Sequence, residues 1–492
     1  MSRPVIGFAG MTHLGINSAA AAAARGFETV CFDTDAGIIT KLKSGKLSIA
    51  EPGLPELLER SKQRFAFTTD VIDLKQCDVV YISADVPTDD QGQSDLSGIR
   101  ALIDTVTAGL GRDAVLVILC QVPPGFTRAL ALPKERLYYQ VETLIFGQAV
   151  ERAVHPERFI VGCAALERPL PPAYGTFLST FGCPILPMRY ESAELAKISV
   201  NCCLVASVTV ANTLAELCEQ IGADWSEIAP ALKLDKRIGP HAYLGPGLGL
   251  AGGNLERDLA TLCRLADAYG TDAGVVRAWM TNSSHRRDWA LRTLHGEVLA
   301  ANPKAVIGVL GLAYKENTHS TKNSASLALI AQLKPWRLRV HDPVVPASAV
   351  AHPNATGCAS ALEAAQAADA LVIMTPWPAF RDLKADQLAR SMAGRAVIDP
   401  YHVLDGKAVV TAGLDYFTLG VPPLRAAGST CASPLIKEGR RHLERHAEPS
   451  ERETDEPRSS RLARRARLYR PHARLGAATC RHRRAPGQQR KP

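Results

Sequence analysis

Short continuous runs of aliphatic and aromatic residues alternate with helical segments along the first 125 residues. Such runs are typical of strands that are buried on both faces. An Ala-rich segment at 16–24 predicts a helix after the first run. Buried strands separated by helices indicate a parallel sheet with helices on both faces, so we expect an α/β domain. The predicted strands lie at 4–10, 28–33, 77–83 and 114–120.

A long helical region comes next, and strand–helix alternation then begins again. The helical pattern runs from about residue 191 to 299 and is interrupted by a Gly-rich segment at 239–253. Beyond it, further apolar runs predict a second, smaller parallel sheet. These runs lie at 306–311, 338–342, 370–375 and 396–399. We therefore expect an α/β fold with two Rossmann-like parallel-sheet domains joined by a central helical region, divided at 1–190, 191–300 and 301–430.

The composition is that of a globular protein, with 46 % hydrophobic and 22 % charged residues among 492. No uninterrupted apolar run reaches the ~18 residues of a membrane span, and the N-terminus shows no apolar signal core. The 12 cysteines form no CxxC pair, so neither a disulfide framework nor a metal site is predicted. We expect a cytoplasmic protein with reduced thiols and no membrane partner.

The basic charge is concentrated at the C-terminal end. The segment 440–492 carries 15 Arg and one Lys against five Glu and one Asp, a net +10, whereas residues 1–439 carry −2. The segment has no Val, Ile, Phe or Trp, so we expect a disordered, Arg-rich tail. A nucleic-acid or membrane-surface arm is an alternative, but the tail lacks aromatic interleaving, so nucleic acid is not the expected partner. A change of reading frame near residue 440 is a third explanation.

A glycine-containing turn lies after the first predicted strand and opens the first helix. Its sequence runs from Gly10 to Gly15 (GMTHLG), and Asp33 ends the next strand, as in a dinucleotide-binding turn. Gly10 allows the tight turn, Gly15 allows close helix–strand packing, and the helix N-terminus offers N–H groups to a pyrophosphate. Asp33 is placed to bind a ribose diol, which favours NAD over NADP. Thr12 replaces the middle glycine, so a strand–helix turn without a ligand stays an alternative.

Further motifs occur in a fixed order over residues 4–425. In chain order these are 51–54 (EPGL), 81–88 (YISADVPT), 194–201 (ELAKISVN), 237–239 (RIG), 249–258 (GLAGGNLERD), 311–315 (GLAYK) with Thr318, Lys322 and Ser324, and 341–343 (HDP). Together they resemble the UDP-glucose/GDP-mannose dehydrogenase family. The resemblance implies NAD in the first domain, a nucleotide sugar, expected to be a UDP-sugar, between the α/β domains, and a homodimer formed by the central helices.

The resemblance also implies a reaction and residues that perform it. Family members oxidise the C6 alcohol of the sugar to a carboxylate in two hydride transfers, with a cysteine that captures the aldehyde. Lys197 would stabilise or deprotonate the C6 oxygen, Asn201 would hold it, and Asp258 would assist water and proton transfer. The catalytic candidates are Lys197, Asn201, Asp258, Asn254 and Glu142; the cofactor-binding candidates are Gly10, Thr12, Gly15, Asp33, Pro87, Thr88 and Lys322; the substrate-binding candidates are Arg237, Gly252, Tyr314 and Lys315.

Asn254 stands at the position of the family's nucleophilic cysteine. An amide cannot form a thiohemiacetal or a thioester, and the neighbouring pair Cys202 and Cys203 is no evident replacement. Other departures are Gln121, Phe146, Ser320, Lys322 and the segment 399–402 (DPYH). We expect an NAD-dependent dehydrogenase similar to UDP-glucose 6-dehydrogenase, with altered chemistry. A related oxidoreductase for another sugar nucleotide or acid, and a catalytically impaired homologue that binds NAD, nucleotide sugar or a partner, stay open.

Overall fold

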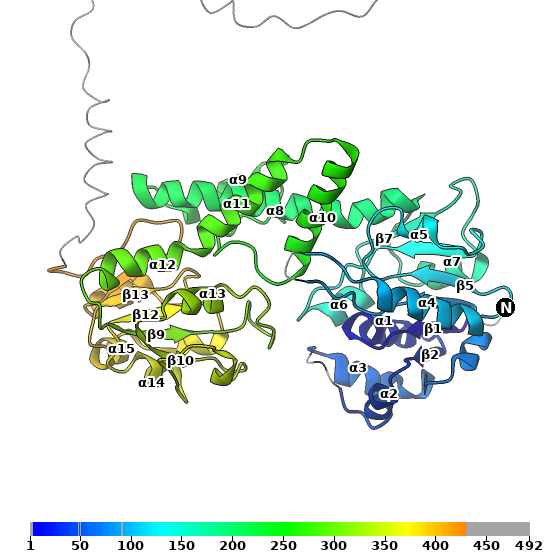
Figure 1. Cartoon of the computed structure of the whole chain (residues 1–492), viewed down its shortest axis with the longest axis horizontal. Coiled ribbons are helices and arrows are strands. Elements are labelled where there is room, and N and C mark those ends of the chain that lie inside the picture. Colours follow the sequence, from blue (N-terminus) through cyan, green and yellow to red (C-terminus); the bar gives the residue numbers. More distant parts are fainter. Residues whose placement is uncertain (1–2, 48, 50, 90–91, 430–492) are drawn as a thin grey trace, which may run out of the picture. The chain divides into compact units, whose positions relative to one another are not determined.

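The computed structural model describes residues 3–47, 49, 51–89 and 92–429 (Figure 1). The segment 440–492, for which disorder is expected, lies outside the described residues. Within the described part, two largely parallel sheets are each covered by helices, and a run of helices lies between them in the chain. The predicted α/β class, with two Rossmann-like domains and a helical central region, is confirmed.

The first sheet contains eight strands. They are β1 (Ile6–Ala9), β2 (Thr29–Phe32), β3 (Phe65–Thr68), β4 (Val79–Ile82), β5 (Val115–Ile118), β6 (Leu137–Gln140), β7 (Phe159–Cys163) and β8 (Ile185–Arg189). Their order is β3-β2-β1-β4-β5-β6-β7-β8, and only the β6–β7 pair is antiparallel. From β1 the chain first adds β2 and β3 on one side of the sheet and then adds β4 and the later strands on the other side. In such sheets ligands bind at the carboxyl ends of the two strands where the order reverses, here β1 and β4.

Alternate residues of the central strands enter two separate cores. In β4, Tyr81 packs with α1 (His13–Ala24), whereas Ile82 packs with α4 (Ser97–Gly109) on the opposite face. The C-terminal half of α1 is six consecutive alanines, whose small side chains let the helix lie close to the sheet. The other helices here are α2 (Ala36–Lys43), α3 (Leu54–Ser61), α5 (Phe126–Ala129), α6 (Ala149–Val154) and α7 (Pro172–Ser179), with 3₁₀ turns at Lys62–Arg64 and Val71–Gln76.

The second sheet has six parallel strands and repeats the arrangement of the first six. They are β9 (Val306–Leu310), β10 (Arg337–His341), β11 (Ala355–Gly357), β12 (Ala370–Ile373), β13 (Ala396–Ile398) and β14 (Asp415–Phe417). The order is β11-β10-β9-β12-β13-β14, so β9 takes the central place that β1 has in the first sheet. Its helices are α13 (Ala325–Gln332), α14 (Ala361–Ala365), α15 (Ala385–Ser391) and α16 (Gly406–Thr411), with 3₁₀ turns at Ala347–Ala349 and Pro378–Asp382.

The central region is a group of helices built around one long member. They are α8 (Tyr190–Ile221), α9 (Trp225–Leu234), α10 (Asn254–Tyr269), α11 (Gly274–Arg287) and α12 (Trp289–Leu294), followed by a π-helical turn at His295–Leu299. α8 packs against both α10 and α11. The predicted Gly-rich interruption falls between α9 and α10.

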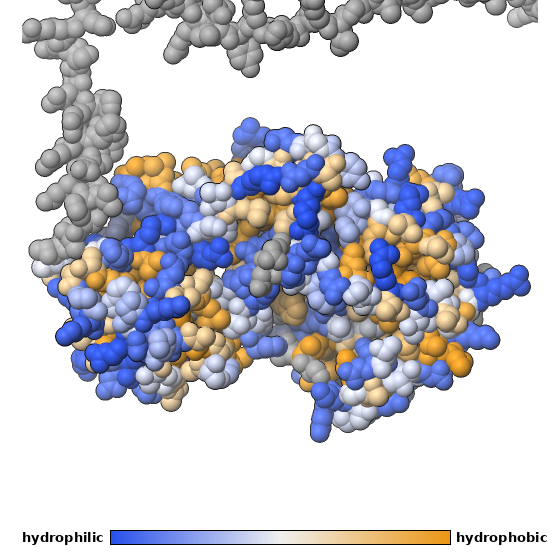
Figure 2. All heavy atoms as spheres, viewed as in Figure 1, coloured by the Kyte–Doolittle hydropathy of each residue, from blue (hydrophilic) through white to orange (hydrophobic). Residues whose placement is uncertain are grey.

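One face of α8 is apolar and exposed. Val210, Leu214, Leu217 and Ile221 recur at helical spacing and are each more than a third exposed. Figure 2 shows hydrophobic residues over the central helices along the upper edge of the view. By length and composition alone α8 meets the test for a membrane-spanning helix, which core helices of soluble proteins also meet; 33 % of its most apolar window is buried.

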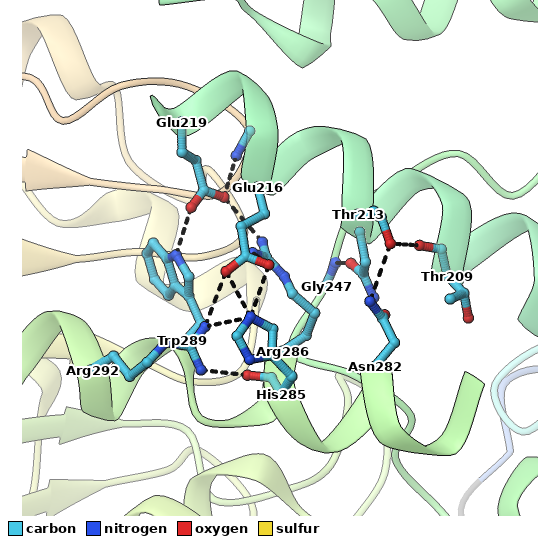
Figure 3. Close-up of polar contacts among 12 residues, drawn as sticks. Thr209, Thr213, Glu216, Glu219, Gly247, Asn282, His285, Arg286, Trp289 and Arg292 are labelled. Atoms are coloured by element: carbon cyan, nitrogen blue, oxygen red, sulfur yellow. Dashed lines mark hydrogen bonds and ion pairs between the residues drawn. The ribbon is translucent and has the colours of Figure 1, made fainter. Parts of the chain in front are cut away.

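A buried ionic cluster fastens the C-terminal third of α8 to α11 and α12 (Figure 3). Arg286 is fully buried, and its guanidinium lies 3.0 Å from Glu219 and 3.3 Å from Glu216. The indole N–H of Trp289 and the backbone N–H of Gly420 also donate to Glu219, at 2.9 and 3.0 Å. Because Gly420 comes after β14, a single carboxylate joins the central helices to the second sheet.

Candidate active site

The turn between β1 and α1 has the geometry of a dinucleotide cradle. Gly10 has φ +95°, and a Cβ there would lie 2.6 Å from the Cβ of Ala84. A Cβ on Gly15 would lie 1.9 Å from the carbonyl oxygen of Gly10, so only glycine lets α1 start this close to the strand. Asp33 comes after β2, is nearly buried, and accepts the backbone N–H of Met11 at 2.7 Å. These residues fit the turn, pyrophosphate and ribose contacts of NAD.

Thr12 lies in the cradle, and its side chain is hydrogen-bonded to another part of the first domain. Its backbone is extended, and its Oγ1 accepts the backbone N–H of Asp85 at 3.0 Å. The hydroxyl therefore points to the loop after β4. Pro87 and Thr88 continue this loop; Pro87 is exposed and Thr88 is half-buried. The cofactor candidates of the first domain thus gather at the carboxyl ends of β1, β2 and β4.

A buried pair that the sequence did not predict lies under the cradle. His13 Nε2 and Glu51 Oε2 are 2.9 Å apart, and both side chains are almost fully buried. Glu51 also accepts the backbone N–H of Gly147 and Ala149. The ring of Phe146 stacks on His13, with centroids 4.0 Å apart. The EPGL motif thus ties the start of α1 to the segment after β6, in which Glu142 lies.

The second sheet carries an equivalent acid. Asp342 comes after β10 as Asp33 comes after β2, and its carboxylate accepts the backbone N–H of Leu312 at 2.6 Å, as Asp33 accepts that of Met11 at 2.7 Å. Asp342 also accepts the backbone N–H of Val345 at 2.8 Å and the indole N–H of Trp377 at 3.0 Å. The two sheets thus share the contact between this acid and the first turn, and Asp342 has further donors from its own loops.

Lys197 and Asn201 lie one helical turn apart near the start of α8 and each contacts another candidate. Lys197 Nζ is 3.2 Å from Glu142 Oε2, and both side chains are mostly buried. The amide of Asn201 donates to Asp258 of α10 at 2.5 Å. Four of the five catalytic candidates therefore form two neighbouring pairs that share one face of α8.

Asp258 is held by donors from three directions. The Gln121 amide donates to its Oδ1, Arg257 Nε lies 3.4 Å from the same atom, and Arg257 also donates to the Gln121 amide oxygen. Burial raises the pKa of Asp258, while Arg257 and Asn201 oppose that rise. The Gln121 amide thereby bridges a buried carboxylate and a buried guanidinium.

Asn254, the fifth catalytic candidate, is the first residue of α10. It is exposed and lies one turn before Asp258 on the same helix. Cys202, on α8, is half-buried, and burial with the nearby charge of Asp258 raises its pKa to about 11. Cys202 is therefore a neutral thiol at physiological pH and packs beside the apolar cluster of α10.

Three of the substrate-binding candidates gather between the central region and the second sheet. A Cβ on Gly252 would lie 3.2 Å from the Tyr314 ring, and the Gly252 N–H donates to the carbonyl of Lys322 at 3.1 Å. Lys315 Nζ donates to the carbonyl of Phe146 at 2.9 Å, and burial lowers its pKa. Arg237 lies apart from them, with 89 % of its side chain exposed and Asp235 as its ion-pair partner.

A cavity of about 480 Å³ opens where these segments meet. Thr88 of the first domain and Lys322 of the second line it, together with Arg257 and Arg287 of the central helices. Asp89 and Glu256 also line it, so the cavity combines three cationic with two acidic side chains and is large enough for part of a polar ligand.

Glu194 was also missed as a positioning residue. It is fully buried in α8, and its carboxylate accepts the backbone N–H of Gly125 at 2.6 Å and of Thr127 at 2.8 Å. It therefore fixes the loop that carries Gln121. The ELAK motif contains this glutamate, so its presence beside Lys197 was the available signal.

The chain matches three family models. They are the NAD binding domain (residues 5–168), the central domain (191–284) and the UDP binding domain (308–406) of the UDP-glucose/GDP-mannose dehydrogenase family. UDP-glucose 6-dehydrogenase TuaD of Bacillus subtilis (strain 168) is 28 % identical over 432 residues, covering 85 % of this chain and 93 % of that protein. UDP-glucose 6-dehydrogenase of Pseudomonas aeruginosa is 29 % identical over 440 residues, covering 84 % and 96 %.

The fold is also similar to solved structures. A UDP-glucose dehydrogenase from the hyperthermophilic archaeon Pyrobaculum islandicum superposes with a TM-score of 0.72 and 26 % identity, over 83 % of this chain and 98 % of that chain. The similarity thus spans both sheets and the central helices.

Proposed function

Because the chain belongs to the UDP-glucose/GDP-mannose dehydrogenase family, we propose that it oxidises the C6 alcohol of a UDP-sugar without a covalent enzyme intermediate. Membership establishes an NAD-dependent nucleotide-sugar dehydrogenase fold with a UDP binding domain. The observation that carries the proposal is the pairing of Lys197 with Glu142 beside the pairing of Asn201 with Asp258.

The Lys197–Glu142 pair is suited to the first oxidation. NAD, when bound, accepts the hydride that leaves C6. Lys197 stabilises the negative charge that develops on the C6 oxygen, since a preorganised cation binds an alkoxide more tightly than an alcohol. Glu142, whose carboxylate lies 3.2 Å from Lys197 Nζ, takes up the hydroxyl proton through the lysine. The alcohol thereby loses a hydride and a proton and becomes an aldehyde.

Asn254 determines the fate of the aldehyde. Without a thiol the aldehyde either leaves as the product or is hydrated and oxidised again, with a second NAD. Asp258 is the base for the hydrated form, because burial raises its pKa and a more basic carboxylate accepts a proton more readily. The Asn254 amide at the start of α10 can donate to the aldehyde or diol oxygen without forming a bond to carbon.

We also propose a homodimer formed by the apolar face of α8. Val210, Leu214, Leu217 and Ile221 form a stripe that residues of the described chain leave exposed. A stripe of this spacing pairs with a second copy of itself in an isologous interface. The same assembly accounts for Arg237, whose exposed side chain then reaches the sugar site of the partner subunit.

NADH formation tests the proposed function. The native protein is incubated with NAD and, in turn, UDP-glucose, UDP-N-acetyl sugars and GDP-mannose, and products are identified by mass spectrometry. We expect NADH with a UDP-sugar, one equivalent where the product is the aldehyde and two where it is the carboxylate. Asn254→Cys is the matched variant. A silent native protein beside an active variant would instead identify a catalytically impaired homologue that retains binding.

A further inference from the structure

The amide of Gln121 covers the carboxylate that the proposed second oxidation needs. Gln121 is the third residue after β5, and its amide N–H donates to Asp258 Oδ1 while its amide oxygen accepts from Arg257. Arg257 Nε lies 3.4 Å from the same Oδ1, and the Asn201 amide donates to Oδ2 at 2.5 Å. Because a carboxylate oxygen accepts about two hydrogen bonds, Oδ1 has no position left for a water or a diol hydroxyl.

The surrounding chain holds this contact in place. Glu194 of α8 accepts the backbone N–H of Gly125 at 2.6 Å and of Thr127 at 2.8 Å, which fixes the loop that carries Gln121. Asp258 lies in the first turns of α10, and only 2 % of its side chain is exposed. Since the loop is fixed and the acid is buried, the Gln121 amide can leave Asp258 only by rotation of its own side chain.

A cavity of about 370 Å³ borders this contact. It is lined by Gln121 and Asp258, together with Ile198 of α8 and Gln93 of the loop after β4. It has room for several water molecules, each of which takes up roughly 30 Å³. Rotation of the amide would therefore expose Oδ1 to water, whereas the contact as it stands excludes water from that atom.

We propose that Gln121 is a positioning residue that determines the product, because it covers Asp258 and the reaction then stops at the aldehyde. The inference rests on the proposed function, in which Asp258 is the base for the hydrated form. In that second oxidation, water adds to the aldehyde carbon, a diol hydroxyl gives its proton to Asp258, and the hydride on C6 passes to a second NAD. The products are the carboxylic acid and NADH. With Oδ1 occupied, the diol proton lacks its acceptor.

The ratio of NADH formed to sugar consumed tests the inference. The full chain is incubated with NAD and UDP-glucose or UDP-N-acetyl sugars, and aldehyde and acid are quantified by mass spectrometry. We expect about one NADH per sugar from the native protein, with the aldehyde as main product. Gln121→Met keeps the length of the side chain and removes both hydrogen bonds, so the share of acid in the product should rise at least ~tenfold. Gln366→Met, at an exposed glutamine of the second domain, is the matched control.

Gln121→Glu separates the lost donor from any change of shape. It keeps the shape of the side chain and an acceptor for Arg257, but it has no N–H for Asp258, so the share of acid should rise here too. The share of acid does not depend on the total rate, so partial unfolding of a variant would not imitate this result. An unchanged share in either variant would overturn the inference, as would a native protein whose main product is the acid.

Supplying the aldehyde of the UDP-sugar directly distinguishes failure of the inference from failure of the proposed function. The variants should then form NADH faster than the native protein, and equal rates would overturn the inference alone. No NADH from the alcohol or from the aldehyde, in the native protein or in either variant, would contradict the proposed function together with the inference.

Unfolding in urea tests the contact itself, without cofactor or sugar. The unfolding midpoints of the native chain, Gln121→Met, Asp258→Asn and the double variant form a double-mutant cycle. Since the two side chains contact each other, the shifts of the single variants should not add up to the shift of the double variant. Additive shifts would overturn the inference.

Discussion

Lys197 contributes a mostly buried ammonium group whose ion-pair partner, Glu142, lies 55 residues away in the chain. Holding this cation in place before the substrate arrives removes the reorganisation that water would require. The neighbouring Asp258 is arranged in the opposite sense, as a buried anion with donors from Asn201, Gln121 and Arg257. In the proposed reaction, charge stabilisation thus falls to a cation on α8, and proton transfer falls to the carboxylates of Glu142 and Asp258.

Lys197→Met should abolish oxidation while leaving the cofactor site intact. The change keeps the length of the side chain and removes the charge, so we expect kcat to fall at least ~100-fold. The affinity for NAD should stay within about twofold of the native value, because the dinucleotide turn does not contact Lys197. NADH formation and NAD titration measure the two effects. Lys75→Met, at an exposed lysine, is the matched control, and retention of kcat in Lys197→Met would remove Lys197 from the reaction.

The sequence predicts the candidate residues of the site better than their partners. Lys197, Asn201 and Asp258 stand in motifs with local spacing, and the structure brings them together. The His13–Glu51 and Arg257–Gln121 contacts join residues 38 and 136 positions apart, and pair preferences over such distances leave no trace in a single sequence. Arg237 is the opposite case. Its motif is recognisable in the sequence, but within one subunit its ion-pair partner is Asp235, which is not among the candidate site residues.

At the scale of elements, burial separates the predicted strands of the first sheet from the two missed edge strands, but not from β6 and β7, which are buried and were also missed. All four residues of β1, β2, β4 and β5 are buried, and each strand stands out as an apolar run. β3 and β8 lie at the two edges of the sheet with mixed exposure, so their patterns carry no clear period. β6 is buried but contains Gln140, whose amide oxygen accepts the hydroxyls of Tyr81 and Tyr174. Because Gln140 interrupts the apolar run and its hydrogen-bond partners are distant in the chain, the sequence pattern does not identify β6 as a core strand.

Glu219→Ala should destabilise the junction of α8 with α11, α12 and the second sheet. It leaves the fully buried Arg286 with a weaker counterion and removes the acceptor of Trp289 and Gly420. Breaking one side of a buried ion pair costs about 3–5 kcal/mol, so the free energy of unfolding in urea should fall by roughly that amount. Glu219→Gln keeps an acceptor for the two N–H groups and should lose less.

The matched control for this variant is an exposed ion pair. Glu59 and Lys62 are 71 % and 64 % exposed, so Glu59→Ala should change the free energy of unfolding by less than ~1 kcal/mol. If Glu219→Ala and Glu59→Ala were equally mild, the cluster in Figure 3 would contribute no more than a surface pair.

At the scale of the whole molecule, the exposed stripe on α8 and the outlying Arg237 point to the same assembly. Mixing two inactive variants, Lys197→Met and Arg237→Ala, tests it by complementation. A mixed dimer has one site with both native residues, so equal amounts should recover about a quarter of native activity after subunit exchange. Activity is measured as NADH formation before and after exchange. No recovery, together with dimers in sedimentation analysis, would place Arg237 outside the partner's site.

Leu217→Glu is the companion variant, since a charge in the stripe should yield monomers in sedimentation analysis. When Leu217→Glu is added to both the Lys197→Met and the Arg237→Ala chains, mixing them should no longer restore activity. This result would show that complementation requires the apolar face of α8.

α8 has 32 residues without proline or glycine, and by its rise per residue it is about 48 Å long. Its first turns carry Lys197 and Asn201, and its last turns carry the Glu219 junction and the apolar stripe. A helix without a kink moves as one rigid body, so in the proposed dimer a small rotation at the end that carries the stripe would displace the lysine at the other end. Two α8 helices packed side by side in the proposed dimer would couple the alignment of one active site to that of the other mechanically, with no ligand passing between the two sites.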